Sequence, residues 1–156
     1  MHLRVEWARA LKLRDGTRQN LIYITELKKL PKVAGVYIFA RRFGKSFEAL
    51  YVGKANDIRQ RVKTQLNNLR LMQHVKHAKI GGRFVLAGRI DTRPGQRIPK
   101  CLVLVERTLI RYFLSEGHDL VNKQGTRLRR HEVVSSGKYP KQAIPALMYL
   151  EKAKGD

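Results

Sequence analysis

Two short apolar runs, residues 36–40 and 50–52, most constrain how this chain can fold. Each run is bounded by glycine and basic residues and has the length of a β-strand. Because few residues separate them, they predict the two arms of a β-hairpin. Tyr37 and Tyr51 then project from neighbouring strands. The hairpin therefore predicts a pair of phenolic hydroxyl groups held near one another.

Basic residues follow directly on this hairpin. Lys54 stands at the predicted end of the second strand, and Arg61 stands about a helical turn into the next element. Asn56 or Asp57 can cap the start of that helix. Its predicted apolar stripe comprises Ile58, Val62, Leu66 and Leu69. Arg61 borders this stripe, so the sequence favours a guanidinium group anchored at the edge of the core, where it could grip and polarise a phosphate together with the phenols.

A second predicted helix, over residues 100–116, carries a carboxylate within an apolar face. The residues at helical spacing on this face are Leu102, Glu106, Leu109 and Phe113. An ionised carboxylate in such surroundings needs a cation, or else it takes up a proton. Two partners remain open for Glu106 at this point: a divalent metal ion, or a basic side chain such as Arg61.

The charge of the chain predicts a polyanionic partner. Lys and Arg number 33 against 12 Asp and Glu, which gives a formal net charge of +21 and a pI near 10.8. Basic residues occur along the whole chain, so no detachable tail accounts for the excess. We predict nucleic-acid contacts that are insensitive to base sequence and are weakened by salt. The residues predicted to make them are Arg41, Arg42, Lys45, Arg59, Lys63, Arg127, Arg129 and Arg130.

Two alternatives to nucleic acid are a solvated basic face and an anionic membrane surface. The membrane is disfavoured because no long segment has one strongly apolar and one basic face. No apolar run approaches the roughly 20 residues that span a bilayer. The start of the chain lacks the apolar block of a secretion signal. Cys101 is the single cysteine, which excludes an internal disulfide and a Cys-rich zinc site and is consistent with a reducing cytoplasm.

The order of the candidate residues resembles the GIY-YIG nuclease family. Its Gly-Val-Tyr and Tyr-Val-Gly strands match residues 35–37 and 51–53, and Lys-Ala after the second strand resembles the form seen in the incision subunit of bacterial nucleotide excision repair. Arg61 resembles the helical arginine of the family, in preference to Arg59. Glu106 resembles its metal-binding glutamate, and Asn122 its terminal asparagine. Dispersed matches in the right order are far more specific than any one of them.

The resemblance implies an α/β (α+β) fold with a small central antiparallel sheet of about three strands flanked by helices. It covers a core of about residues 30–122 in one domain, with extensions 1–29 and 123–156. The implied function is metal-dependent hydrolysis of phosphodiester bonds, most readily in DNA, by a cytoplasmic, nucleoid-associated protein. A binding module of the same fold that is inactive or needs a partner is the alternative. Double-strand cleavage would need a homodimer, a partner protein or two sequential events.

The same resemblance assigns roles to the residues of the site. Gly35 and Gly53 shape the two strands, and the other predicted site residues are Tyr37, Tyr51, Lys54, Arg61, Glu106 and Asn122. Arg61 stabilises the transition state, Glu106 binds one Mg²⁺ or Mn²⁺ ion, and Asn122 braces the site. Relatives often carry Tyr or His where this chain has Gln65. Because glutamine cannot act as a base, the base role moves to Tyr37, with help from Tyr51 or Lys54.

Three segments outside the motif complete the expectations. Residues 5–13 are compatible with an extra strand or a short helix. Residues 83–90 alternate enough to form a third strand. Beyond the core, residues 127–134 can form a strand or a basic arm, and residues 143–152 are predicted to form a packing helix.

Overall fold

The chain folds into a mixed α/β structure, which confirms the predicted fold class. The structure is a computed structural model and describes residues 2–121 and 129–152. The helices are η1 (Thr17–Gln19), η2 (Leu27–Lys29), α1 (Ile58–Leu66), α2 (Leu69–His77) and α3 (Ile98–Ser115). The strands are β1 (Arg4–Trp7), β2 (Leu11–Lys12), β3 (Arg14–Asp15), β4 (Tyr23–Ile24), β5 (Gly35–Phe43), β6 (Ser46–Ala55), β7 (Gly82–Asp91), β8 (Arg129–Val134) and β9 (Leu147–Lys152). In the described part of the chain, no helix has the length and apolar character to cross a membrane.

The central sheet is antiparallel and has the strand order β1-β7-β5-β6, with β2 also paired to β7. The predicted hairpin is β5–β6, and the predicted third strand is β7. The sheet has five strands, more than the three expected, because the N-terminal extension supplies β1 and β2. Residues 5–13, for which the sequence allowed either a strand or a helix, therefore contribute strands to the sheet. Gly44 turns the hairpin with a φ of 57°, a left-handed conformation that favours glycine.

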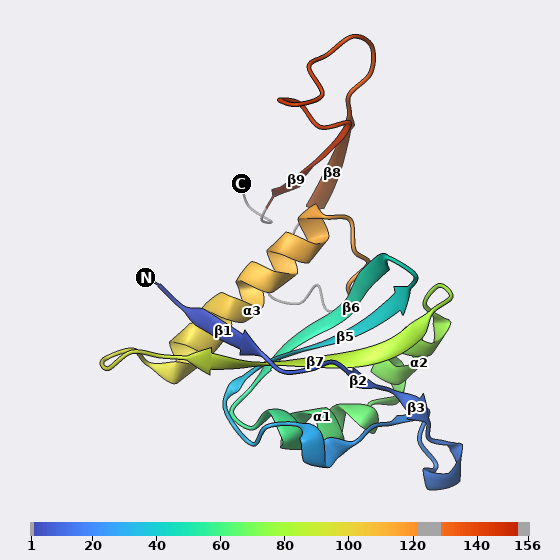
Figure 1. Cartoon of the computed structure of the whole chain (residues 1–156), viewed down its shortest axis with the longest axis vertical. Coiled ribbons are helices and arrows are strands. Elements are labelled where there is room, and N and C mark those ends of the chain that lie inside the picture. Colours follow the sequence, from blue (N-terminus) through green and yellow to red (C-terminus); the bar gives the residue numbers. More distant parts are fainter. Residues whose placement is uncertain (1, 122–128, 153–156) are drawn as a thin grey trace.

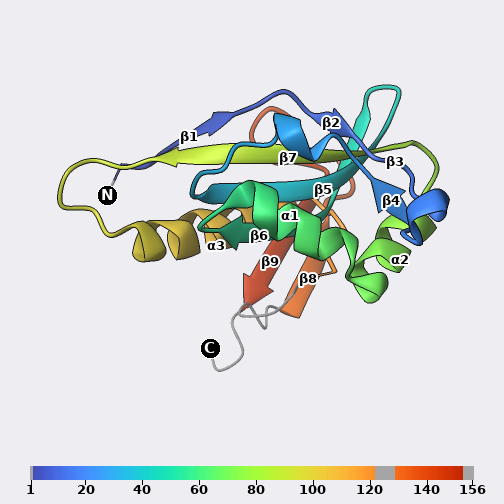
Figure 2. The same cartoon turned by 90° about the horizontal axis from the view of Figure 1, so that it is seen from below.

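The two faces of the sheet bury different sets of side chains. Tyr37 and Phe39 of β5 pack with α1 and α2, whereas Val36 and Ile38 pack with α3. Successive strand residues point to opposite faces, so neighbouring residues of β5 enter different cores. Figures 1 and 2 show α3 on one side of the sheet and α1 with α2 on the other. The sheet is therefore a partition between two groups of side chains.

Two separate helices, rather than one continuous helix, follow β6. Asp57 accepts a hydrogen bond from the Gln60 amide at 3.0 Å and caps α1. Asn68 accepts one from the Leu71 amide at 3.1 Å and starts α2. Leu69 is consequently the first residue of α2 and is 62% exposed, so its predicted place in the apolar stripe of α1 is wrong. The Asn68 cap redirects the chain before the stripe can continue.

The end of α2 is fixed by one arginine from β7. The guanidinium group of Arg83 donates hydrogen bonds to five backbone carbonyl groups, those of Val75, Lys76, Ala78, Lys79 and Gly81, at 2.7–3.2 Å. The last carbonyl groups of a helix lack partners within the helix, and a cation close to them is also favourable. Arg83 thus attaches α2 to the sheet and has a structural role.

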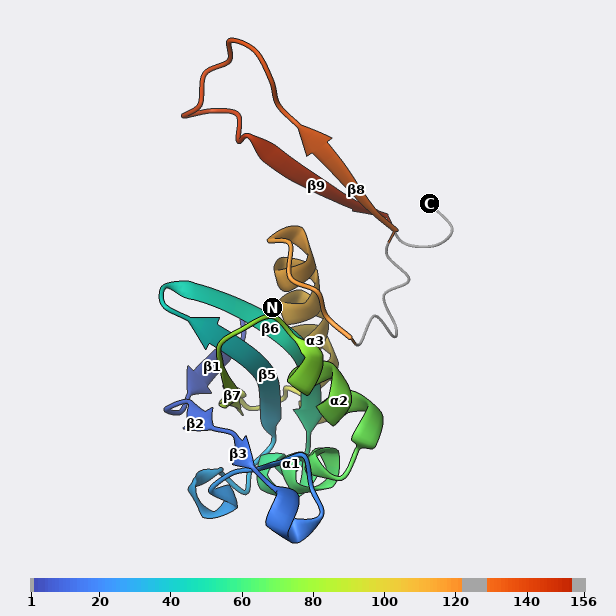
Figure 3. The ribbon, with the colours of Figure 1, turned by 90° about the vertical axis from the view of Figure 1, so that its right-hand side faces the viewer.

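The C-terminal part forms a second hairpin, β8–β9, with Val133 paired to Met148. Figure 3 shows this hairpin beyond α3, away from the central sheet. The strand alternative for residues 127–134 is confirmed over Arg129–Val134. The predicted helix over residues 143–152 is wrong, because residues from Leu147 onward pair with β8 as a strand. Pairing across the hairpin outweighs the local helical preference of this segment.

Candidate functional site

Two tyrosine hydroxyl groups meet on the face of the sheet that packs with α1. Tyr37 and Tyr51 stack with ring centroids 5.9 Å apart and an angle of 29° between the ring planes. The side-chain amide of Gln65 donates hydrogen bonds to both phenolic oxygens, at 2.9 Å to Tyr37 and 3.1 Å to Tyr51. Gln65 is buried on α1 and so brings both phenols to one amide. Both hydroxyl groups therefore lie on the same face of the sheet, as a shared phosphate site requires.

Gly53 makes room for this cluster. It stands directly opposite Tyr37 across the β5–β6 ladder. A Cβ atom at residue 53 would collide with the ring and the hydroxyl oxygen of Tyr37. The ring of Tyr37 consequently lies over β6, the edge strand, whose backbone also binds the segment after α3 through the Val121 amide on the Leu50 carbonyl. Glycine is required here by close packing.

The surroundings of Tyr37 keep its phenol neutral. Burial raises the pKa of Tyr37 far above its ordinary value, and the neighbouring Tyr51 raises it further. The hydrogen bond from Gln65 and the charge of Arg61 act in the opposite direction but are smaller causes. A phenol with so high a pKa is a poor base near neutral pH. The geometry therefore gives no support to Tyr37 as the general base, while the half-buried Tyr51 is more accessible.

Arg61 is exposed on α1, one helical turn before Gln65. Residues four apart lie on the same side of a helix, so the guanidinium group and the tyrosine cluster share one side of α1. Arg61 also lines a shallow hollow of about 250 Å³ between the end of β6 and α1, together with Ala55 and Asp57. The sequence favoured anchoring at the core edge, whereas the side chain is open to solvent. An exposed guanidinium group of this kind can contact a phosphate.

Glu106 pairs with Lys54 on the opposite face of the sheet. The ammonium Nζ atom of Lys54 donates a hydrogen bond to the Oε2 atom of Glu106 at 2.9 Å. The Glu106 side chain is 17% exposed and that of Lys54 is 41% exposed. The sequence left either a metal ion or a basic side chain as the partner of Glu106. The structure shows a basic side chain, which is Lys54 and not Arg61. Lys54 reaches α3 because it shares a face with Val36, its partner in β5.

The predicted residues thus form two groups, separated by the sheet. Gly53 belongs to the tyrosine group, and the next residue, Lys54, belongs to the group on α3. Glu106 makes no hydrogen bond to either tyrosine among the contacts of the described residues. Because β6 is the edge strand, the two groups approach one another only around that edge. A phosphate bound by both groups would have to lie at this edge.

A single carboxylate suits one kind of metal ion. Among the described residues, no cluster of three or more His, Cys, Asp or Glu side chains could hold a metal. Mg²⁺ commonly uses one or two protein carboxylates and completes its shell with water and phosphate oxygens. Glu106 fits that pattern, since Lys54 engages only its Oε2 atom. The ammonium group now occupies one cation position beside the carboxylate.

Two of the predicted phosphate contacts are already engaged in structural interactions. Arg41 forms an ion pair with Glu48 at 3.3 Å and donates to the Ile80 carbonyl. Arg59 donates to the carbonyl groups of Leu30 and Lys28, both at 2.8 Å, and so ties α1 to η2. We leave both arginines out of the proposed interface.

The remaining predicted contacts differ in what the structure describes. Arg42, Lys45 and Lys63 are exposed and remain candidates for phosphate contact. Arg129 and Arg130 lie in β8, where the structure describes only the backbone. Asn122 and Arg127 lie outside the described residues.

Sequence reasoning treated Gln65 only as a missing base and overlooked its contacts. Its side-chain oxygen also accepts a hydrogen bond from Asn68 at 3.2 Å, so the residue joins the tyrosines to the start of α2. Its place one turn after Arg61, on the side of α1 that faces the sheet, is the sequence signal that could have indicated these contacts. Gln65 organises the site.

Replacing Gln65 by methionine should therefore lower the free energy of unfolding by about 1–3 kcal/mol, because the buried phenol of Tyr37 and the half-buried phenol of Tyr51 lose their donor. The change keeps the length of the side chain and removes its polar atoms. The measurement is urea denaturation, with the exposed Gln60→Met on the same helix as the control. An equal stability for Gln65→Met and Gln60→Met would contradict the structural role of the amide.

Comparison with known proteins adds no relative to this description. No protein-family model, no curated protein and no solved structure matches the chain.

Proposed function

We propose that the protein is a metal-dependent endonuclease of the GIY-YIG type that hydrolyses phosphodiester bonds in DNA. One observation carries the proposal: the paired hydroxyl groups of Tyr37 and Tyr51 lie on the same side of α1 as the exposed Arg61. A second polar group, formed by Lys54 and Glu106, begins three residues after Tyr51 on the same edge strand. Together they supply hydroxyl, guanidinium, ammonium and carboxylate groups around one edge of the sheet.

Each group has a distinct task in the proposed reaction. Water attacks phosphorus and releases a proton to the solvent, the bond to the 3′ oxygen breaks, and the departing oxygen takes up a proton. The accessible hydroxyl of Tyr51 orients the water, while the neutral Tyr37 and Gln65 hold Tyr51 in place. Arg61 stabilises the charge that develops on the phosphate oxygens. Lys54 contacts the same phosphate from the other side of the edge.

Glu106 is the residue that would hold a divalent ion. When bound, Mg²⁺ or Mn²⁺ would screen the phosphate charge and stabilise the leaving oxygen. Lys54 would then exchange its contact with the carboxylate for one with the phosphate. The half-buried position of Glu106 keeps competing water away from the ion pair and strengthens its interaction with a cation.

The charge of the chain supports a nucleic acid as the substrate class. A net charge of +21 favours association with a polyanion and makes the affinity fall with rising salt. The exposed residues Arg42, Lys45 and Lys63 extend the cationic surface beyond Arg61. Such contacts position a DNA backbone without reading its bases.

The competing function is a binding module without turnover, on its own or until a partner joins it. The ion pair between Lys54 and Glu106 favours it, because the carboxylate already has a cation. The separation of Glu106 from the tyrosines by the sheet favours it too. This module would bind nucleic acid through the same basic surface.

Nicking of supercoiled plasmid decides between the two functions. We expect Mg²⁺ or Mn²⁺ to support conversion to the open circular form and a chelator to abolish it, because the proposed reaction needs the ion at Glu106. Binding measured in the same buffers by electrophoretic shift provides the control. Tight, salt-sensitive binding without nicking in any metal would refute the nuclease and favour the binding module. Light scattering with and without DNA tests whether a dimer accompanies double-strand cleavage.

A further inference from the structure

A second hollow, of about 590 Å³, lies between the N-terminal extension and the two helices α1 and α2. Its volume falls within the range of about 300–1,000 Å³ that is usual for small-molecule sites. The extension lines it with Asp15, Thr17, Asn20, Leu21, Ile22 and Tyr23, and the helical region lines it with Leu66, Asn67, Leu69, Met72 and Lys76. None of these residues belongs to the proposed catalytic group.

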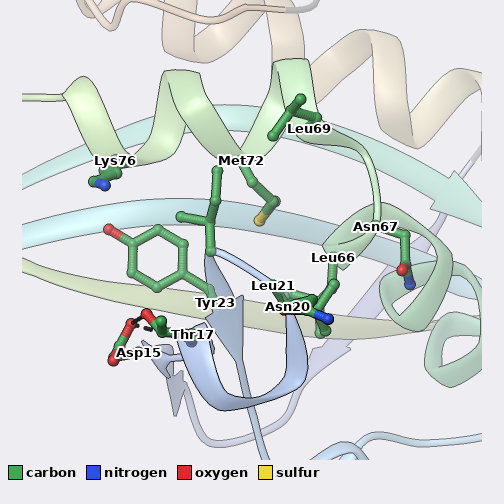
Figure 4. Close-up of a pocket in the computed structure, with 11 residues that line it drawn as sticks. Asp15, Thr17, Asn20, Leu21, Tyr23, Leu66, Asn67, Leu69, Met72 and Lys76 are labelled. Atoms are coloured by element: carbon green, nitrogen blue, oxygen red, sulfur yellow. Dashed lines mark hydrogen bonds between the residues drawn. The ribbon is translucent and has the colours of Figure 1, made fainter.

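The lining combines an apolar wall with polar groups at its ends. Figure 4 shows Tyr23 between Lys76 and Met72 on one side and Asp15 and Thr17 on the other. In the same view Asn67 lies at the opposite end from Lys76. Such a hollow suits a flat ligand with hydrogen-bonding edges better than a purely apolar ligand. The faces of the flat ligand meet apolar groups of the lining, and its edges meet polar groups.

Asp15 indicates which kind of ligand group binds at its end of the hollow. Its Oδ1 atom accepts hydrogen bonds from the hydroxyl and the amide of Thr17, at 2.7 and 3.3 Å, which leaves its Oδ2 atom to accept others. A carboxylate accepts hydrogen bonds from the N–H groups of a base, and its repulsion of phosphate is only partly offset by Lys76 in the same lining. Tyr23, half-buried beside it, offers an aromatic ring for stacking. These features favour a nucleobase over a phosphate group at this end.

The hollow is linked to the tyrosine cluster through the chain, although neither tyrosine lines it. Leu66 and Asn67 in its wall directly follow Gln65 along the chain. Asn68 donates a hydrogen bond to the Oε1 atom of Gln65 and starts the helix that carries Leu69 and the rest of that wall. Exposed basic residues, Arg18, Lys63 and Arg70, lie close in sequence to lining residues on both sides. These basic residues could hold the backbone of a nucleic-acid strand near the hollow.

We propose that the hollow receives an unpaired nucleobase of the bound nucleic acid. The inference rests on the proposed function and adds a substrate class, namely DNA with an unstacked base next to the cleaved bond. Only a base that has left the duplex can enter such a site. The free-energy cost of taking a base out of the duplex is small when that base is already unpaired. The protein thus prefers gapped, mismatched or single-stranded DNA to fully paired DNA.

A variant that fills the hollow tests the inference. Leu69 is 62% exposed at the mouth, so Leu69→Trp adds bulk there without disturbing the core. Gln73→Trp, exposed on the same helix and absent from the lining, is the matched control. Fluorescence anisotropy compares a fluorescein-labelled duplex with the same duplex carrying a one-nucleotide gap opposite an unpaired base. We expect Leu69→Trp to weaken binding to the gapped duplex by about tenfold and to leave binding to the paired duplex unchanged.

The outcomes separate this inference from the proposed function. If the wild-type protein binds both duplexes equally, or if Leu69→Trp and Gln73→Trp have equal effects, the base-binding role is refuted. Metal-dependent nicking of paired plasmid by Leu69→Trp would persist in that case, because the variant does not touch the tyrosine cluster. Conversely, a protein that prefers the gapped duplex but never nicks plasmid would refute the nuclease and keep the base-binding role.

Discussion

Replacing Arg61 by alanine should reduce plasmid nicking about 10³-fold or more, the loss typical of removing an arginine that stabilises a phosphoryl transition state. The side chain is exposed, and its guanidinium group makes no hydrogen bond within the described part of the chain. Its removal should therefore leave the stability of the fold unchanged. Arg61→Lys should recover only a small part of the activity, because an ammonium group cannot make a bidentate contact with a phosphate.

Arg59 provides the control for this prediction because it lies on the same helix and has the same chemistry. Its guanidinium group is bound to the backbone carbonyl groups of Leu30 and Lys28. Arg59→Ala should therefore lower the free energy of unfolding by about 1–3 kcal/mol and retain nicking. Initial nicking rates and urea denaturation, measured on both variants, separate the two roles. Loss of activity in Arg59→Ala with full activity in Arg61→Ala would reverse the assignment.

Replacing Glu106 by glutamine should reduce metal-dependent nicking about 10²- to 10³-fold, because the site loses the charge that would hold the ion. The substitution keeps the shape of the side chain and its hydrogen-bond acceptor. It also leaves the ammonium group of Lys54 without an anionic partner. DNA binding without metal should therefore stay the same or increase. The measurements are nicking rates across a range of Mn²⁺ concentrations and binding in the presence of chelator.

Glu48 is the matched control for Glu106. Its side chain is 20% exposed, close to the 17% of Glu106, and it also pairs with a basic residue, Arg41. Glu48→Gln removes an ion pair of similar burial on the same sheet without affecting the proposed metal ligand. It should lose some stability and keep nicking activity. Equal activity of the two variants would show that Glu106 has only the structural role of pairing with Lys54.

The central hairpin could be predicted because its signals are local. Apolar runs bounded by glycine give the strands, whereas the register beside Tyr37 also depends on an irregularity between Phe39 and Ala40. The helix over Ile98–Ser115 could be predicted from its repeating apolar residues in the same way. Both features depend on residues close together in the sequence, and the structure confirms both.

The partners within the candidate site could not be predicted from spacing. Lys54 and Glu106 are 52 residues apart, and their contact depends on which face of β6 each residue takes. The register of the β5–β6 ladder decides this, because it places Lys54 opposite Val36 on the α3 side. A strand shifted by one residue would exchange the faces. The sequence could therefore name the charged residues of the site but not their pairing.

The burial of Tyr37 likewise emerges only from the three-dimensional structure. The motif marks the residue as chemically important but does not reveal that Phe39, Tyr51 and the helices enclose its ring. Enclosure raises the pKa of the phenol and so removes its suitability as a base. Gln65, which the sequence offered only as an absent base, proves to be its hydrogen-bond donor.

The pairing of β1 and β2 with β7 sets the order in which the chain can be assembled during synthesis on the ribosome. Both strands emerge first, yet β7 (Gly82–Asp91), the strand with which they pair, is translated about 70 or more residues later. The β5–β6 hairpin, by contrast, can close as soon as its own turn has left the exit tunnel. The amino-terminal strands must therefore wait as unpaired backbone until β7 has been made, and they then dock on it as an outer border.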